Sequence, residues 1–416
     1  MSTPSSPAPA ASSSFAALKF PPYRAQFVCY VLTMMADNIE HVISYWMMFQ
    51  KFHSPALAGF AVLSHWLPFL FFSVAVGGLA DRIDRRRIIQ CGMLLFIAAS
   101  TGWGIFFITD SLTMWGAMAL LVVHGFAGVL WQTPNQLLLY DIVGPANLPS
   151  AVRLNATARY LGVLVGPAVG SFIMLALGPS HGIVLNTLFY LPMLLWLFWA
   201  PARDAAATVS RVAVRGLADI VDTIRTASAY PVLISMMLLA GLSSFLVGNA
   251  YNAQMPGYAN DLGHGDPGVS YSMLLAADAA GALVAGFALE AWGRLKPAPG
   301  LAMLLAMLWA ASLLMFSFAK IYPLAIAFLF AAGFFELSFN TMAQALVQLN
   351  APNEIRGRVV GLYNMSGLGM RAFSGITVGL MGAAIGIHWS LGGSAAVLLV
   401  ALFFLRRFVQ ARQRKI

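Results

Sequence analysis

The sequence predicts an all-α membrane protein with about twelve transmembrane helices, arranged as two pseudo-symmetric six-helix bundles. Of its 416 residues, 60% are hydrophobic and only 9% are charged, whereas a soluble domain is about one quarter charged. The apolar residues form continuous runs long enough for the roughly 20 residues that a helix needs to cross the hydrocarbon. Such runs do not alternate as the strands of a transmembrane barrel do, so helices are expected throughout.

The predicted helices follow one another along the whole chain. They cover residues 25–50, 55–79, 88–109, 112–140, 151–177, 182–200, 231–255, 268–290, 298–319, 323–348, 358–383 and 386–405. The expected parts are a disordered cytoplasmic tail rich in Ser, Pro and Ala, an N-terminal bundle, a polar cytoplasmic linker, a C-terminal bundle and a basic cytoplasmic tail. In that order they span residues 1–18, 19–200, 201–230, 231–406 and 407–416.

Basic residues are distributed unequally between the predicted loops, and they accumulate on the cytoplasmic side of membrane proteins. With the N-terminus inside, the linker arginines and most other loop cations fall on that side; among them are Arg82, Arg85, Arg86, Arg87, Arg153, Arg294, Lys296, Arg356 and Arg358. Only Lys51 and Lys320 fall outside. We expect a multi-pass protein of the bacterial inner membrane with both termini cytoplasmic. The net charge of +9 then reflects topology, and no nucleic-acid partner is expected.

The two halves show a weak internal repeat. At one constant offset, Gly77 aligns with Gly286, Asp81 with Glu290, Arg85 with Arg294, Gly166 with Gly375 and Gly170 with Gly379. The first three pairs follow the second predicted helix of each half, and the last two lie in the fifth. This arrangement is typical of parallel repeats related by an axis along the membrane normal.

The loop after the second predicted helix carries the first motif, Gly-Gly-Leu-Ala-Asp-Arg-Ile-Asp-Arg-Arg-Arg over residues 77–87. Gly77 permits close helix packing, and Asp81 can accept hydrogen bonds from the N-terminus of a neighbouring helix. The arginines can pair with an acid such as Asp141, at the end of the fourth helix. The candidate gate residues are Gly77, Asp81, Arg82, Arg85, Arg86 and Asp141. Alternatively, the arginines serve topology alone.

The fifth predicted helix carries the second motif, with Gly162, Gly166, Pro167 and Gly170 at helical spacing. Small residues let helix backbones approach closely in lipid, and Pro167 removes a backbone donor and favours a kink. A bent, closely packed fifth helix suits a rocking interface. Packing alone, without a transport role, is the alternative explanation.

The two motifs resemble the first signature and the antiporter signature of the major facilitator superfamily. The resemblance covers the whole chain and is closest to the branch that holds the enterobactin exporter and macrolide-type drug efflux pumps, in which the segment 352–359 has its R-G-R-V form. It implies the major facilitator fold, export by alternating access and a cytoplasmic latch at the first motif. Two positions depart from the pattern of the superfamily: Asp84 replaces a glycine of the first signature, and Leu121 stands where many proton antiporters carry an arginine.

Ionisable residues inside the first predicted helix are the strongest site candidates, because a charge at mid-membrane costs about 2.5–3.5 kcal/mol. Asp37, Glu40 and His41 share one helical face, and we expect this face to line the central cavity. Two nearby acids oppose each other's ionisation, so one of them could take up and release a proton. A structural hydrogen-bonded cluster and a transition-metal site without an obvious fourth ligand are the alternatives.

Further polar candidates lie in the fourth, eighth, tenth and eleventh predicted helices. They are His124, Asn135, Asp278, Glu336, Asn340 and Arg371. Glu336 and Asn340 belong to a polar stripe along the tenth helix, and His124 and Asn135 to one along the fourth. Interhelical hydrogen bonds could explain both stripes, and Arg371 could pair with Glu336 or Asp278.

The predicted function is secondary active export of a small organic molecule, such as a drug, siderophore or secondary metabolite, by proton antiport. No nucleotide-binding motif is present, so ATP is not expected as the direct energy source. No nucleophile–base pair or HExxH-type site appears either, and we predict neither an enzyme nor a bound cofactor or resident metal. The expected partners are the substrate, protons and the lipid bilayer, and the expected state is a monomer. An uptake permease of the same fold and a transporter of a metal ion or chelate, using Asp37, Glu40 and His41, remain alternatives.

Overall fold

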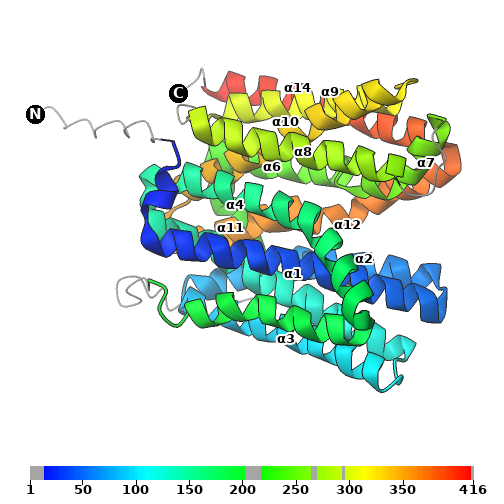
Figure 1. Ribbon diagram of the computed structural model, residues 1–416. Helices are drawn as coiled ribbons and strands as arrows, with labels where there is room; N and C mark the ends of the chain where they lie inside the picture. The colour runs from blue at the N-terminus through cyan, green and yellow to red at the C-terminus, as the bar shows by residue number, and fades with distance from the viewer. Residues whose placement is uncertain (1–13, 202–216, 264–268, 293–295, 414–416) are drawn as a thin grey trace, which may run out of the picture.

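The computed structural model describes residues 14–201, 217–263, 269–292 and 296–413. Within these ranges every regular element is a helix. The N-terminal half begins with the short η1 (Ala16–Lys19) and continues with α1 (Pro21–Phe52), α2 (Pro55–Ala80), α3 (Arg85–Ile108) and α4 (Met114–Trp196). In Figure 1, α1, α2 and α3 lie in the lower part of the view and most helices of the C-terminal half lie above them, and the long helices of both halves run along one common direction.

The 83 residues of α4 form three antiparallel segments. The chain leaves helical geometry at Gly144 (φ 70°) and Gly178 (φ 76°), in a backbone region that favours glycine. Phe96 of α3 packs against both Trp131 and Tyr190 of α4, which a straight helix rising about 1.5 Å per residue would hold far apart. We call residues 114–143, 145–177 and 179–196 the first, second and third segments of α4.

The C-terminal half repeats this plan with more broken helices. It comprises α6 (Pro231–Leu246), η3 (Ala250–Gln254), α7 (Met255–Asp261), α8 (Val269–Trp292), α9 (Pro299–Ser317), α10 (Tyr322–Asn350), η4 (Asn353–Ile355), α11 (Arg356–Asn364), η5 (Met365–Gly369), α12 (Arg371–Ser374), η6 (Gly375–Leu380), α13 (Met381–Ile385) and α14 (Ile387–Gln413). The elements η5 and η6 are π-helical turns. The elements from α11 to α13 form one interrupted span.

The described residues account for twelve crossings of a membrane. Nine segments are long and apolar enough to span it by length and composition. One of them is α4, whose three segments supply three crossings, and the 32-residue α1 supplies another. The predicted all-α fold with twelve helices in two bundles is therefore confirmed.

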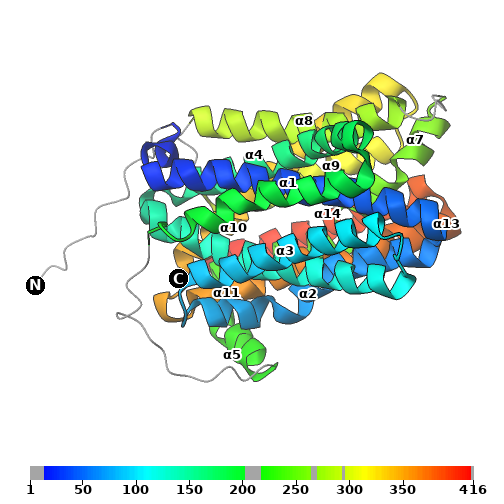
Figure 2. The same ribbon diagram turned by 60° about the horizontal axis from the view of Figure 1, so that its bottom comes forward.

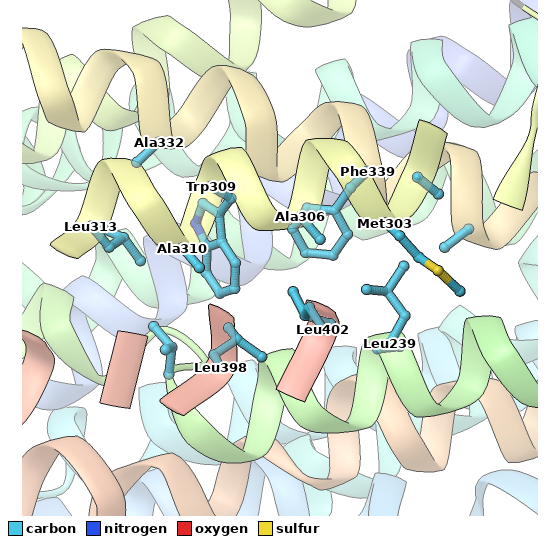
Figure 3. Packing of buried hydrophobic residues seen from close by; sticks show 14 of the residues in the cluster. Leu239, Met303, Ala306, Trp309, Ala310, Leu313, Ala332, Phe339, Leu398 and Leu402 are labelled. Atoms are coloured by element: carbon cyan, nitrogen blue, oxygen red, sulfur yellow. The ribbon is translucent and has the colours of Figure 1, made fainter. Parts of the chain in front are cut away.

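Each half has its own apolar core, and the C-terminal one is shown in Figure 3. There Trp309 of α9 packs against Phe339 of α10, with 5.3 Å between ring centroids. Leu398 and Leu402 of α14 lie below them, and the small Ala306 leaves room for these rings. The outward faces are also apolar: Phe172 and Leu175 are 71% and 83% exposed. Lipid contact explains such exposure.

Three boundaries differ from the predicted organisation. The disordered tail predicted for residues 1–18 is wrong for residues 14–18, because the Ala17 N–H donates to Ser150 Oγ at 3.1 Å and the Ser14 hydroxyl donates to the carbonyl of Ala291 at 2.6 Å. The predicted linker contains a helix, α5 (Leu217–Ser228), which lies outside the bundle in Figure 2. The predicted basic tail starts as a continuation of α14, up to Gln413. Residues 1–13, 202–216 and 414–416 lie outside the described residues.

Candidate functional site

A buried polar group joins α1 to the first segment of α4. His124 Nδ1 lies 2.9 Å from Glu40 Oε1, and His124 Nε2 lies 2.9 Å from Asp37 Oδ1. The other oxygen of Glu40 accepts a hydrogen bond from the hydroxyl of Ser100 on α3. One imidazole thus sits between two carboxylates 84 and 87 residues away in the chain, a geometry that stabilises the positive charge of a protonated His124.

Two more histidines adjoin this group. The ring centroids of His41, His65 and His124 are 4.8 to 5.6 Å apart, and one ligand atom from each lies within 4.8 Å of those of the others. Asp37 Oδ2 is 3.9 Å from His41 Nδ1. Three imidazoles and a carboxylate at these separations are a set of donors that suits a transition metal.

The prediction that Asp37, Glu40 and His41 line the central cavity is wrong. The polar face of α1 turns toward α2, α3 and α4 of its own half, because Ser100 and His124 supply partners there. Glu40 is buried inside this half, at 2% exposure. Asp37 and His41 keep 13% and 22% of their side chains exposed, so part of the group is accessible.

The central cavity lies between the two halves and has a volume of about 100 Å³. Asn135 and Asn340, both predicted site residues, line it together with Arg371. The other predicted candidates, His124, Asp278 and Glu336, lie outside its wall. Asn364 of α11 also lines the cavity and contacts the other half. It donates a hydrogen bond to Thr133 Oγ1 at 3.0 Å and accepts one from Gln136 Nε2 at 3.1 Å.

The acids of the C-terminal half lie behind the cavity wall. Glu336 Oε1 is 3.9 Å from Arg371 Nη2, so the pairing considered for Arg371 is a loose one. Asp278 accepts a long hydrogen bond of 3.4 Å from the hydroxyl of Tyr251. Of the two predicted site residues in the polar stripe of α10, Asn340 lines the cavity and Glu336 does not.

Two residues of these sites were missed by the sequence analysis. Arg159, in the second segment of α4, lines the cavity, and His65 of α2 completes the histidine group. Arg159 lies inside the predicted helix 151–177, and the rule that singled out Asp37 applies to it equally. His65 carried no such signal, because a single histidine in an apolar helix is usually a packed core residue.

The first motif closes the end of the molecule that carries Arg82, Arg85, Arg86 and Arg87, which we call the basic end. Asp81 accepts hydrogen bonds from the backbone N–H groups of Gly357 at 2.7 Å and of Arg358 at 3.2 Å, where α11 begins. A Cβ atom on Gly77 would lie 2.0 Å from the carbonyl oxygen of Gly357. The helix-terminus contact expected of Asp81 and the close packing expected of Gly77 are confirmed.

The arginines of this motif have different surroundings. Arg85 is buried and pairs with Asp141, as expected, and also donates to the carbonyl of Leu137 at 3.1 Å. Arg86 pairs with Asp84 of its own loop at 2.6 Å. The Nε and Nη2 atoms of Arg82 are buried and have no hydrogen-bond partner among the described residues.

The repeat-related position in the C-terminal half makes the reciprocal contact. Glu290, at the end of α8, is fully buried and accepts from Arg153 Nε at 2.8 Å and from Ser150 Oγ, both on the second segment of α4. A Cβ atom on Gly286 would lie 1.8 Å from Thr157 Oγ1. The end of the second helix of each half thus packs on the start of the fifth helix of the other. Arg294, the predicted counterpart of Arg85, lies outside the described residues.

The glycines of the second motif pack directly on α1. A Cβ atom on Gly162 would lie 2.7 Å from Met34 Cβ, and one on Gly166 would lie 2.6 Å from Asn38 Cβ. A Cβ atom on Gly170 would lie 3.2 Å from Ile39 Cα, a tight but less severe contact. Their repeat-related glycines, Gly375 and Gly379, have no atom within 4 Å of such a Cβ. The second motif therefore fixes the backbone of α1 beside Asp37, and only in this half.

Solved structures of two transporters have the same arrangement. The human organic anion transporter MFSD10 superposes with a TM-score of 0.73 at 14% identity, over 93% of this chain and 100% of that one. The fucose:proton symporter FucP of E. coli gives 0.71 at 13% identity, over 93% and 98%. A structure of FucP described as a major facilitator superfamily transporter in the outward conformation gives 0.67 at 14% identity, over 94% and 98%. At these identities the likeness shows the fold.

Fold and motifs together define a multi-pass membrane transporter of the major facilitator superfamily. The chain belongs to the family described as transmembrane secretion effectors, whose model matches residues 12–415. It is also 23% identical over 365 residues to the multidrug efflux pump Tap of Mycolicibacterium fortuitum. The aligned region covers 86% of this chain and 88% of that protein. The resemblance to exporters of this superfamily is thereby confirmed, and the chain falls among transporters, as the sequence predicted.

Proposed function

We propose that this protein exports a small organic molecule across the bacterial inner membrane, by proton antiport and alternating access, as a monomer with both termini in the cytoplasm. The family and the efflux pump it resembles support export. The basic composition of the end that carries the first motif supports a cytoplasmic position for that end.

Alternating access is supported by the contacts at the basic end. The two reciprocal contacts, of Asp81 with α11 and of Glu290 with α4, hold the halves together there. The cavity lies farther along, between the same halves. In an inward-open state both contacts would have to break, so Gly77, Asp81, Arg85 and Asp141 are proposed as parts of the cytoplasmic gate.

Proton coupling is proposed to use Asp37, Glu40 and His124. The observation that carries it is that one imidazole lies 2.9 Å from both carboxylates within the membrane. Loss of a proton from His124 leaves two adjacent negative charges unbalanced, which is costly in a low-dielectric interior. Proton uptake and a change in the packing of α1 are therefore coupled, and Gly162 and Gly166 of the second motif transmit such a change to the second segment of α4.

The test begins with a susceptibility panel of antibiotics and dyes in an efflux-deficient bacterial host. A compound to which the parent protein gives resistance is then added to inverted membrane vesicles with an acidic interior, and the collapse of the pH gradient is recorded. We expect the parent to release protons on addition of the compound, and Asp37→Asn and Glu40→Gln to lose most of the initial rate, because each removes a group proposed to handle protons.

The matched control is Asp110→Asn, an acid at the exposed end of α3 that pairs with Lys51. It should couple like the parent. Equal proton release by Asp37→Asn, Glu40→Gln and the parent would contradict the coupling proposal. Accumulation of the compound by cells that express the parent would identify an uptake permease instead.

A second candidate function is transport of a transition-metal ion or its chelate. It is favoured by the separation of His41, His65 and His124, whose ligand atoms lie within 4.8 Å of one another, and by the nearby Asp37. Zinc prefers ligand distances of about 2.0–2.1 Å for imidazole, so small shifts of these side chains would close the site. Histidine and carboxylate groups suit zinc or nickel.

Isothermal titration of the purified protein with zinc or nickel separates the two candidates. If the metal function is correct, His65→Asn should abolish binding, whereas His53→Asn, at an exposed position after α1, should not change it. The readout is metal binding itself, so it does not depend on proton release, and zinc or nickel binding that His65→Asn leaves unchanged would contradict the metal function.

A further inference from the structure

The central cavity is bordered by positive charge. Its charged lining side chains are Arg159, from the second segment of α4, and Arg371, from α12. The other polar side chains of its wall are amides and hydroxyls, and no carboxylate of a described residue lines it. The two arginines come from opposite halves, so both reach one ligand only when the halves enclose it.

The guanidinium groups are poorly satisfied by the protein. Arg159 makes no hydrogen bond or ion pair with any described residue. Arg371 has its nearest carboxylate oxygen at 3.9 Å, and its Nε is buried without a hydrogen-bond partner among the described residues. A buried guanidinium nitrogen without a partner, as at Arg371 Nε, is unfavourable, and an anion in the cavity would satisfy it and also pair with Arg159.

The neighbouring acids offset only part of this charge. Glu336 interacts electrostatically with both arginines, and Asp278 contacts Tyr251. Both carboxylates lie behind the wall, so neither takes up space or donors inside the cavity. The arginines remain the charged groups that an entering molecule meets.

The backbone around Arg371 is also irregular. This residue stands between the π-helical turns η5 and η6, and such turns often occur at functional sites. Its guanidinium carbon lies 5.2 Å from the ring centroid of Trp66 on α2. The aromatic ring helps to hold the guanidinium in place by a cation–π contact.

We propose that the cavity binds an organic anion, a carboxylate, sulfonate or phosphate ester, whose acidic group is held by Arg159 and Arg371. The planar fork of arginine matches such groups in a bidentate manner. Tyr30, Tyr160 and Tyr363 line the same cavity and supply surfaces for a flat apolar part. The proposal rests on the proposed function in one respect, because it takes this cavity as the site of the transported molecule.

The test uses two probes of the same flat shape and opposite charge, benzoate and benzamidinium. Thermal unfolding of the purified full-length protein in a neutral detergent is followed at increasing probe concentration, with ionic strength equalised by sodium chloride. A ligand that binds the folded state raises its melting temperature. We expect benzoate to raise it with the logarithm of its concentration above the dissociation constant and benzamidinium to leave it unchanged.

Substitutions then locate the site. Arg159→Gln and Arg371→Gln should each weaken apparent benzoate binding by about tenfold or more, as expected for loss of a charge-assisted hydrogen bond. Arg159→Lys keeps the charge and should retain part of the binding, which separates charge from a general effect on folding. The matched control is Arg24→Gln, an exposed arginine near the start of α1, which should bind benzoate like the parent.

Stabilisation by benzamidinium, stabilisation by neither probe, or undiminished benzoate binding in Arg159→Gln would each overturn the proposal. The binding assay needs no gradient, so it fails or succeeds independently of transport. Benzoate binding without proton release in vesicles would contradict proton-driven export and leave the anion site standing. Proton-coupled export restricted to cations would support proton-driven export and contradict the anion site.

Discussion

Asp81 and Gly357, 276 residues apart in the chain, join the two halves through a 2.7 Å hydrogen bond from the Gly357 N–H to the Asp81 carboxylate. The bond exists because α2 ends where α11 begins, and because neither Gly77 nor Gly357 has a Cβ atom to hold the two backbones apart. The acid therefore caps a helix of the other half, where the positive end of the helix dipole favours a negative charge. Rocking of the halves must break this contact.

The contact at Asp81 should depend on pH. Burial raises the pKa of Asp81 to about 6, although the N–H groups of Gly357 and Arg358 act in the opposite direction. Once the loop separates from α11 and Asp81 is hydrated, its pKa returns toward 3.8. The closed contact then binds a proton more readily than the open one, so closure is most favoured below pH 4 and weakens as the pH rises through about 6.

Spin labels at Ile83 and Glu354, both exposed at the basic end, can follow this change after Cys91→Ser removes the exposed native thiol. The fraction of molecules with separated labels should be larger at pH 7.5 than at pH 5. Asp81→Asn, which stays neutral and still accepts hydrogen bonds, should show little change between the two. An identical pH response in the variant would assign the effect to another group.

Substitution of Gly166 should be far more damaging than the same substitution at its repeat-related position. In Gly166→Ala the new Cβ would lie 2.6 Å from Asn38 Cβ, so α1 must shift, at a cost of about 1–3 kcal/mol for overpacking. Gly375→Ala meets no atom within 4 Å and serves as the matched control. Melting temperatures in detergent compare the two, and equal values would show that the second motif does not pack as described.

Removal of one partner from the ion pair of Arg85 and Asp141 should destabilise the fold much more than the same change in an exposed pair. Both side chains are at most 10% exposed, and removal of one partner from a buried pair costs about 3–5 kcal/mol because the other charge is left unpaired. We expect Asp141→Asn to lower the melting temperature and Arg85→Met combined with Asp141→Leu to restore much of it.

The exposed pair of Lys51 and Asp110 provides the control for this experiment, since its nitrogen and oxygen are 2.7 Å apart but Asp110 is 94% exposed. Asp110→Asn should leave the melting temperature unchanged within error. A double substitution at Arg85 and Asp141 that is no better than Asp141→Asn would contradict the assignment of the loss to an unpaired buried charge.

Loss of the Glu290 charge should open the basic end. Glu290→Gln leaves Arg153 buried with a neutral partner, which destabilises the closed arrangement relative to one in which Arg153 reaches water. Ser338, buried beside Arg153 between the halves, reports this opening when changed to cysteine in the Cys91→Ser background. Its alkylation rate should rise severalfold, whereas Glu354→Gln, at an exposed acid of the same end, should not alter it.

The repeat predicted from aligned residues has a structural counterpart that is only partly symmetric. Asp81 and Glu290 make reciprocal contacts with opposite halves, as their alignment suggests. Gly166 and Gly375 align equally well, yet Gly166 touches α1 and Gly375 lies in a π-helical turn with open space beside it. Sequence alignment shows that two positions are related, but the packing partner of each depends on the other helices of its half.

The sequence by itself determined the class of fold, the twelve crossings and the closing motif at the basic end. These depend on local properties, namely the length of an apolar run, the charge of a loop and the absence of a side chain at Gly77. The tertiary structure alone decided which groups meet. It placed His124 between Asp37 and Glu40 and turned these acids away from the central cavity. It also brought Arg159 and Arg371 to that cavity. A buried charge must find a partner, and the sequence shows the charge, but only the folded arrangement of helices selects the partner.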